Sequence, residues 1–79
     1  MTHNTTRAYS AGMEEARKLG RNLKRLRTVK GISQGDIART LGVHKGYISN
    51  IENGKVTPTL ATIAKISKAV GISISELTK

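Results

Sequence analysis

Three periodic segments of this chain end in a glycine that is followed by an apolar residue. The three tripeptides, at positions 30–32, 41–43 and 70–72, are Lys-Gly-Ile, Leu-Gly-Val and Val-Gly-Ile. Glycine readily adopts the left-handed conformation that closes a helix, and the apolar residue after it packs back on the last helical turn. Asn53-Gly54 is a fourth stop of this kind. The chain is therefore predicted to be a series of helices joined by tight turns.

The starts of the predicted helices agree with these ends. Ser33 and Ser73 are each followed three residues later by an acid, which is the capping-box pattern of a helix N-terminus. Thr57-Pro58 predicts an N-cap followed by proline at the first helical position. No segment requires a strand, so the predicted fold class is all-α, a compact five-helix bundle. Its predicted helices span residues 13–30, 34–41, 45–53, 58–70 and 74–78.

The character of the chain changes at Met13. Residues 1–12 are polar and show no apolar period, so we expect a mobile N-terminal arm there. From Met13 onward apolar residues recur at spacings of three and four, as on one face of a helix, and residues 13–79 are predicted to form one domain. The predicted core is aliphatic and consists of Leu19, Leu23, Leu26, Ile37, Ala38, Leu41, Val43, Ile48, Ile51, Ile63, Ile66, Val70, Ile72 and Leu77.

The charge of the chain indicates a polyanionic partner. Fourteen Lys and Arg against five Asp and Glu give a formal charge of +9 on 79 residues. Seven of the basic residues fall between positions 17 and 30, where no acid occurs. Such an excess favours nucleic acid over anionic lipid. A cationic membrane-active helix is disfavoured because the chain has no tryptophan or phenylalanine.

Other classes of protein are disfavoured by what the chain lacks. With no cysteine, one histidine in the predicted domain and no plausible carboxylate pair, we expect no enzyme, no metal site and no cofactor. No stretch is apolar enough for a membrane span, and the N-terminus lacks the pattern of a secretory signal, so a cytoplasmic location is expected. Small scaffolds without disulfides are commonly stabilised by oligomerisation, which makes a homodimer the expected state.

Residues 34–53 are predicted to form two short helices joined by the turn Gly42-Val43-His44. Two helices joined by a short turn that contains glycine form a helix-turn-helix, whose second helix enters the major groove of DNA. A wider set of residues matches one family pattern: Leu19-Gly20, Leu23, Leu26-Arg27, Gly31-Ile32-Ser33-Gln34, Ile37-Ala38, Leu41-Gly42-Val43, Ile48, Ile51-Glu52-Asn53-Gly54, Pro58 and the segment from Ile63 to Leu77. With these residues in register, the chain resembles the Cro/cI-like phage-repressor helix-turn-helix family, also called the xenobiotic-response-element family.

The resemblance implies which residues contact DNA bases. In the family, the first two positions of the third helix and its sixth position touch base edges, which here are Lys45, Gly46 and Asn50. Lysine suits the acceptors of guanine, and asparagine suits adenine. Gly46 departs from the usual side-chain-bearing residue, so either the backbone approaches the groove closely or one base is left unread. Tyr47 is expected to contact a thymine methyl or a phosphate, and a solvated helix face is the alternative for Lys45 and Asn50.

Phosphate contacts are expected around these base contacts. Gln34, at the first position of the second helix, holds a phosphate in the family, and the free N–H groups of a helix N-terminus favour an anion. Lys55 lies in the loop that follows the DNA backbone in the family. Ser49 and His44 complete the predicted phosphate contacts, and a structural role at the N-cap is the alternative for His44.

Arg27 and Glu52 lie beside core positions on different predicted helices. Each would carry a charge into a small interior, so an ion pair between them is expected, and it matches a pair common in the family. Two independent surface charges are the alternative.

Together these residues and the resemblance imply a non-enzymatic, sequence-specific transcription regulator, bacterial or phage-encoded and associated with the nucleoid. We expect an autoregulating homodimer on double-stranded DNA of two-fold symmetry, joined through Ile72, Ile74 and Leu77 around the last predicted helix. The same fold serves as an antitoxin, whose partner is a toxin, or as a restriction–modification controller, and these alternatives stay open.

Overall fold

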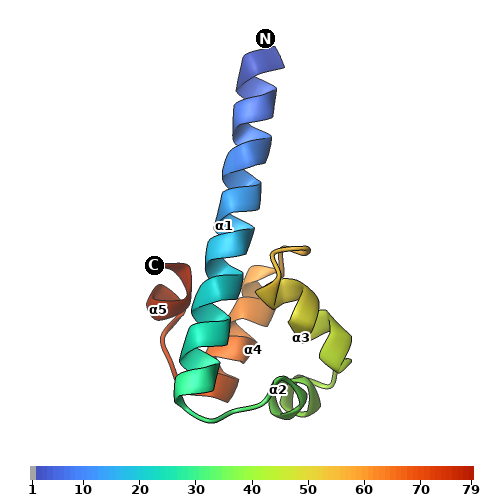
Figure 1. The fold of residues 1–79 in the computed structure, drawn as a ribbon, viewed down its shortest axis with the longest axis vertical. Helices are drawn as coiled ribbons and strands as arrows, with labels where there is room; N and C mark the ends of the chain where they lie inside the picture. The colour runs from blue at the N-terminus through green and yellow to red at the C-terminus, as the bar shows by residue number, and fades with distance from the viewer. Residues whose placement is uncertain (1) are drawn as a thin grey trace.

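The computed structural model describes the backbone of residues 2–79 and the side chains from Gly12 onward. Five helices and no strand occur in this part of the chain. They are α1 (Thr2–Val29), α2 (Gln34–Leu41), α3 (Lys45–Glu52), α4 (Leu60–Val70) and α5 (Ile74–Thr78). Figure 1 shows α1 as a long central helix, with α2 and α3 to one side of it and α5 to the other. The predicted all-α class and five-helix architecture are confirmed.

The caps predicted from the sequence form at both ends of α2. Gly42 takes the left-handed conformation, with φ 74° and ψ 33°, and its N–H donates to carbonyls of the last helical turn. At the other end, Ser33 Oγ accepts from the backbone N–H of Asp36 at 2.9 Å, and the Asp36 carboxylate accepts from the backbone N–H of Ser33 at 3.1 Å. A second capping box forms at Ser73. As a result, α2 and α5 have the predicted bounds.

The start of α4 differs from the prediction. The helix begins at Leu60 and not at Pro58, because Thr59 is its N-cap, with Oγ1 accepting from the backbone N–H of Thr62 at 3.2 Å. Pro58 is instead buried in the loop before the helix.

The start of α1 also differs, because the helix begins at Thr2 whereas Met13 was expected. A nucleated helix gains one backbone hydrogen bond for each residue added, so it can continue beyond the residues that pack. The side chains of residues 1–11 lie outside the described part of the chain. The assignment of residues 1–12 to an arm therefore stays a prediction.

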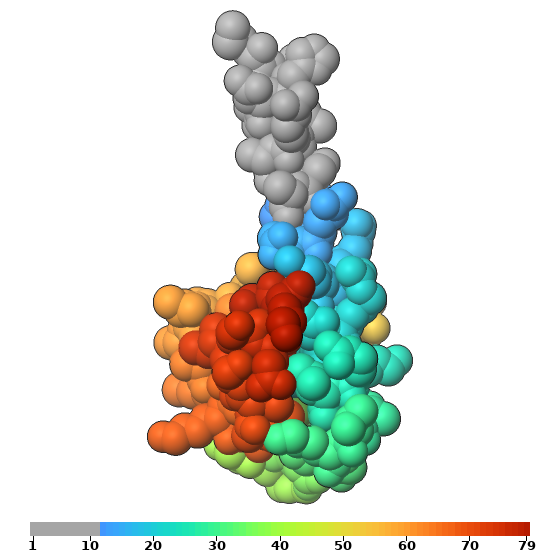
Figure 2. Space-filling view, turned by 90° about the vertical axis from the view of Figure 1, so that its left-hand side faces the viewer, coloured from blue at the N-terminus to red at the C-terminus, as the bar shows by residue number. Residues whose placement is uncertain are grey.

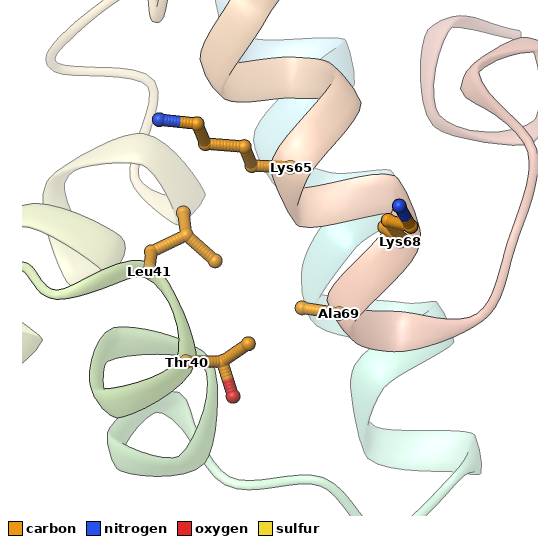
Figure 3. A pocket seen from close by; sticks show the side chains of 5 residues that line it. All are labelled: Thr40, Leu41, Lys65, Lys68 and Ala69. Carbon is orange, nitrogen blue, oxygen red and sulfur yellow. The ribbon is translucent and has the colours of Figure 1, made fainter.

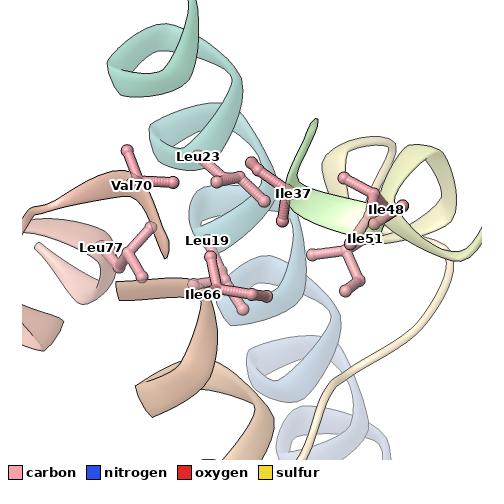
Figure 4. Packing of buried hydrophobic residues seen from close by; sticks show 9 residues of the cluster. Leu19, Leu23, Ile37, Ile48, Ile51, Ile66, Val70 and Leu77 are labelled. Atoms are coloured by element: carbon pink, nitrogen blue, oxygen red, sulfur yellow. The ribbon is translucent and has the colours of Figure 1, made fainter. Parts of the chain in front are cut away.

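The core gathers aliphatic side chains from all five helices, as Figure 4 shows. The buried cluster consists of Leu19, Leu23, Ile37, Ala38, Ile48, Ile51, Ile66, Val70 and Leu77, all of them predicted core residues. The other predicted core residues, Leu26, Leu41, Val43, Ile63 and Ile72, are only half-buried. On the face turned away from α2 and α3, Figure 2 shows α5 set between α1 and α4. None of the helices in the described part combines the length and hydropathy needed to cross a membrane.

Candidate nucleic-acid interface

The helix-turn-helix is formed by α2, α3 and the turn between them. The backbone N–H of Val43 donates to the carbonyl of Ala38 at 2.9 Å, so the turn folds back on α2. Ile48 and Ile51, on the inner face of α3, are both 0% exposed and belong to the core. This packing holds α3 against α1 and α2 and leaves its opposite face at the surface.

The outer face of α3 consists of Lys45, Gly46, Ser49 and Asn50. Ser49 is half-buried and the other three residues are exposed. Tyr47 is half-buried and packs against the core, so only part of its side chain is available to a ligand. The outer face presents an ammonium, a hydroxyl and an amide but no carboxylate. Such a set can bond base edges and does not repel phosphates.

Glu52, the only acid in α3, is turned into the protein, where its side chain is 2% exposed. The carboxylate accepts from Arg27 Nε at 2.7 Å, from Arg27 Nη2 at 3.0 Å and from Gln34 Nε2 at 2.9 Å. The third guanidinium nitrogen, Arg27 Nη1, donates to the carbonyl of Ile32 at 2.9 Å. Hydrogen bonding to Glu52 raises the pKa of the Arg27 guanidinium, whereas burial alone would lower that pKa. The structure thus brings Arg27 and Glu52 together and adds Gln34 to the pair.

A shallow basic hollow lies at the N-terminus of α2. Its lining residues are Arg27, Ser33, Gln34, Gly35, Arg39 and Lys45. The hollow brings Gln34, a predicted phosphate contact, beside Lys45, a predicted base contact. The nearby acid Asp36 accepts from the backbone N–H of Ser33, which lowers the pKa of its carboxyl, and it forms an ion pair with Arg39. A basic lining at a helix N-terminus suits an anion such as a phosphate.

His44 and Lys55 flank α3, and both are exposed. His44 is the N-cap of α3, but its side chain makes no capping hydrogen bond. Lys55 follows Gly54, whose φ of 72° turns the chain after the helix. This turn packs closely on α1, since a Cβ built at position 54 would lie 3.1 Å from the Cα of Arg17. Lys55 and Arg17 consequently line one hollow, and Arg17 was not predicted to belong to the site.

The three predicted dimer residues do not share one exposed surface. Leu77 is 0% exposed in the core of its own chain, so its predicted place in a dimer interface is wrong. Its carbonyl is held from α1 by Asn22 Nδ2 at 2.7 Å. Ile72 is half-buried against the same core. Ile74 is 38% exposed, and Leu60, which was not predicted, is 71% exposed.

Another hollow lies between α2 and α4, as Figure 3 shows. Its lining residues are Thr40, Leu41, Lys65, Lys68 and Ala69. None of the predicted site residues lines it, and its two lysines have no carboxylate or thiol among the other lining residues. Within the described residues, no three metal-ligating side chains come together.

Comparison with known proteins assigns the family. A model described as helix-turn-helix matches residues 23–77. The uncharacterized HTH-type transcriptional regulator y4dJ of Sinorhizobium fredii is 34% identical over 65 residues, which cover 82% of this chain and 84% of that protein. The control protein C.MunI of Mycoplasma sp is 41% identical over 61 residues, which cover 76% of this chain and 82% of that protein.

A solved structure agrees with these relatives. The restriction-modification controller protein C.AhdI from Aeromonas hydrophila matches with a TM-score of 0.76 and 34% identity, over 81% of this chain and 97% of that chain. The resemblance predicted from the sequence is confirmed. The chain therefore belongs to the helix-turn-helix family of DNA-binding transcription regulators.

Proposed function

We propose that this protein recognises a DNA sequence by placing α3 in the major groove. The observation that carries the proposal is the division of α3 into two faces. Lys45, Gly46 and Asn50 are exposed, whereas Ile48 and Ile51 are fully buried. Lysine donates to the acceptors of guanine, and asparagine can both donate to and accept from adenine. The outer face of α3 thus has the chemistry for direct base contacts.

The charges around α3 also support an orientation in which its outer face meets the DNA. The carboxylate of Glu52 is neutralised inside the protein by Arg27, so no acid of α3 faces the phosphates. Gln34 donates one amide hydrogen to Glu52 and keeps a second one for a phosphate at the N-terminus of α2. Lys55 supplies a phosphate contact beyond the other end of α3, and exposed His44 and half-buried Ser49 are further candidates. Contacts at both ends would fix the register of α3 in the groove.

A homodimer on a two-fold operator is the second part of the proposal. Because α5 lies on the opposite side of α1 from α3 (Figure 1), two chains that met through α5 would each keep α3 at the surface. Ile74 is the exposed apolar residue of α5. Such a dimer would present its two α3 helices to half-sites about 34 Å apart. It would act in the cytoplasm, on the nucleoid, and regulate its own promoter.

The relatives favour a more specific candidate, a restriction–modification controller. C.MunI is a control protein and C.AhdI is a restriction-modification controller, and this chain covers 82% and 97% of their respective lengths. A controller would act on DNA without a second protein. An antitoxin would instead co-purify with its toxin, so purification from the native host distinguishes the two candidates.

Selection from a pool of randomised duplexes tests the proposal. The full chain is incubated with the pool, and bound duplexes are sequenced over several rounds. We expect enrichment of an inverted repeat with half-site centres about 10 base pairs apart. An enriched site without symmetry would contradict the dimer, and the absence of any enriched sequence would contradict sequence recognition.

A further inference from the structure

The fold of the free protein does not require a glycine at position 46. It is exposed in the first turn of α3, and its φ is not among the positive values found for glycines of the described chain. Apart from its chain neighbours and the helix backbone around it, a Cβ built on Gly46 would have no atom within 4 Å. Gly20 is the opposite case, since a Cβ there would come within 2.4 Å of the carbonyl oxygen of Ile51. The fold thus requires glycine at position 20 but not at position 46.

A glycine in this place weakens the helix. Glycine is the poorest helix former after proline, and no contact within the described chain compensates for it. Helix α3 has only 8 residues, so each one contributes appreciably to its stability. A glycine without a side chain allows another group to approach the helix backbone closely. No described residue approaches Gly46, so the space beside it is open to a group from a bound ligand.

The neighbours of Gly46 indicate the chemistry of this group. Residues four apart on a helix lie one above the other, so Gly46 lies next to Asn50 on the outer face, with Lys45 beside it. Both neighbours are exposed polar side chains that can bond base edges. Between them, Gly46 presents only its Cα methylene, which is apolar. The 5-methyl group of thymine is the distinctive apolar group on the major-groove edge of a base pair.

We infer, on the basis of the proposed function, that Gly46 is a specificity-determining residue. Its missing side chain leaves room for the methyl group of a thymine between Lys45 and Asn50. The base pair there is selected by shape, next to base pairs that are recognised by hydrogen bonds. A methyl group added at position 46 would occupy the same space and exclude thymine.

The test combines a methyl group added to the protein with a methyl group removed from the DNA. The variant Gly46→Ala adds one methyl to the protein, and uracil in place of thymine removes one from the selected operator. Fluorescence anisotropy gives the affinity of wild type and variant for the operator and for duplexes in which each thymine is replaced in turn. We expect Gly46→Ala to bind the thymine operator about tenfold more weakly, which is the cost of an unfavourable base contact. Uracil at one position should restore the affinity of the variant and should weaken the wild type.

Gly12→Ala is the matched control, because Gly12 is an exposed helical glycine of α1 with no atom within 4 Å of a built Cβ. Both variants should melt at or above the wild-type temperature, since both gain helix propensity. Binding of the thymine operator by Gly46→Ala as tight as by Gly12→Ala would overturn the inference, and so would a loss that no uracil relieves. Failure of the wild type to select any operator would overturn the proposed function as well, so the two failures are distinguishable.

Discussion

Glu52 is the residue on which both the stability of the bundle and the charge of α3 depend. Its side chain is 2% exposed and that of Arg27 is 14% exposed, so loss of either leaves the other charged and unpaired inside the protein. The ion pair between Asp36 and Arg39 offers a comparison, because those side chains are 51% and 75% exposed. Water solvates each member of an exposed pair when the other is removed.

Removal of Arg27 and removal of Arg39 should therefore have different effects on stability. We predict that Arg27→Ala lowers the free energy of unfolding by about 3–5 kcal/mol, as is typical when a buried pair is broken. The matched control Arg39→Ala should lower it by at most about 1 kcal/mol. Thermal melts followed by circular dichroism measure both. Equal melting temperatures for the two variants would show that Arg27 and Glu52 are solvated.

Only part of the residue-level picture could be predicted from the sequence. Arg27 and Glu52 stand next to core positions, which is a local signal of a buried pair. The place of Arg39 beside Lys45 depends on how α2 crosses α3, and no local spacing reports that crossing. Leu77 was predicted both for the core and for a dimer interface, because an apolar residue in a short last helix can pack on its own chain or on a second one. The contacts of α5 with α1 place Leu77 in the core of its own chain.

The crossing of α1 and α3 positions the helix-turn-helix. Gly20 is buried there, and a Cβ on it would lie 2.4 Å from the carbonyl oxygen of Ile51 and 2.5 Å from that of Glu52. Backbone carbonyls cannot move aside as the end of a flexible side chain can. The closeness of α1 to the end of α3 therefore requires glycine at this position.

We predict that Gly20→Ala lowers the free energy of unfolding by about 1–3 kcal/mol or more, because overpacking forces the two helices apart. Gly12→Ala, in the exposed part of the same helix, should leave it unchanged or raise it slightly. Urea denaturation of both variants measures the difference. A midpoint for Gly20→Ala as high as that for Gly12→Ala would contradict the close crossing.

Acid should weaken α2 and α5 through their capping carboxylates. Hydrogen bonds from Ser33 and Ser73 lower the pKa of Asp36 below its ordinary 3.8 and that of Glu76 below its ordinary 4.5. A carboxylate whose pKa is lowered by folding stabilises the fold above its unfolded pKa, and this stability is lost as the pH falls through the folded pKa. Between about pH 6 and pH 3, the melting temperature of Asp36→Asn should fall by less than the melting temperature of the wild type. Equal losses would show that the cap at Ser33 adds no acid-sensitive stability.

Helix boundaries were predictable wherever a side chain or a glycine marks them locally. The capping boxes and the left-handed glycines gave the bounds of α2 and α5. The start of α4 was misassigned because Thr57 and Thr59 are both suitable N-caps, and the burial of Pro58 favours the second. The start of α1 has no such local marker, so the predicted start at Met13 followed only the apolar period.

At the scale of the whole molecule, the position of α5 opposite α3 leads to a prediction about assembly. If two chains meet through α5, Ile74→Asp places a carboxylate in an apolar contact and should give a folded monomer. Val29→Asp is the matched control, because Val29 is 79% exposed at the end of α1 and lies outside α5. Sedimentation equilibrium should give a dimer mass for the control and a monomer mass for the variant. A dimer mass for Ile74→Asp would move the interface elsewhere, and exposed Leu60 would be the next residue to change.

The charge of +9 makes all DNA binding by this protein salt-dependent, so affinity alone does not distinguish recognition of sequence from attraction to phosphates. A base contact affects binding to the operator only. A phosphate contact affects binding to any duplex, and its loss flattens the slope of log K against log salt by about one unit. Asn50 and Lys55 are assigned to these two classes, and both side chains are exposed.

The most direct test is a salt titration of Asn50→Ala on the selected operator and on a scrambled duplex, with Lys55→Ala measured beside it. We predict that Asn50→Ala loses about 1–3 kcal/mol of binding free energy on the operator, almost nothing on the scrambled duplex, and keeps the wild-type salt slope. Lys55→Ala should weaken binding to both duplexes and flatten the slope. If Asn50→Ala lost equal affinity on both duplexes, the outer face of α3 would not recognise sequence through that residue, and the proposed orientation of α3 in the groove would be wrong.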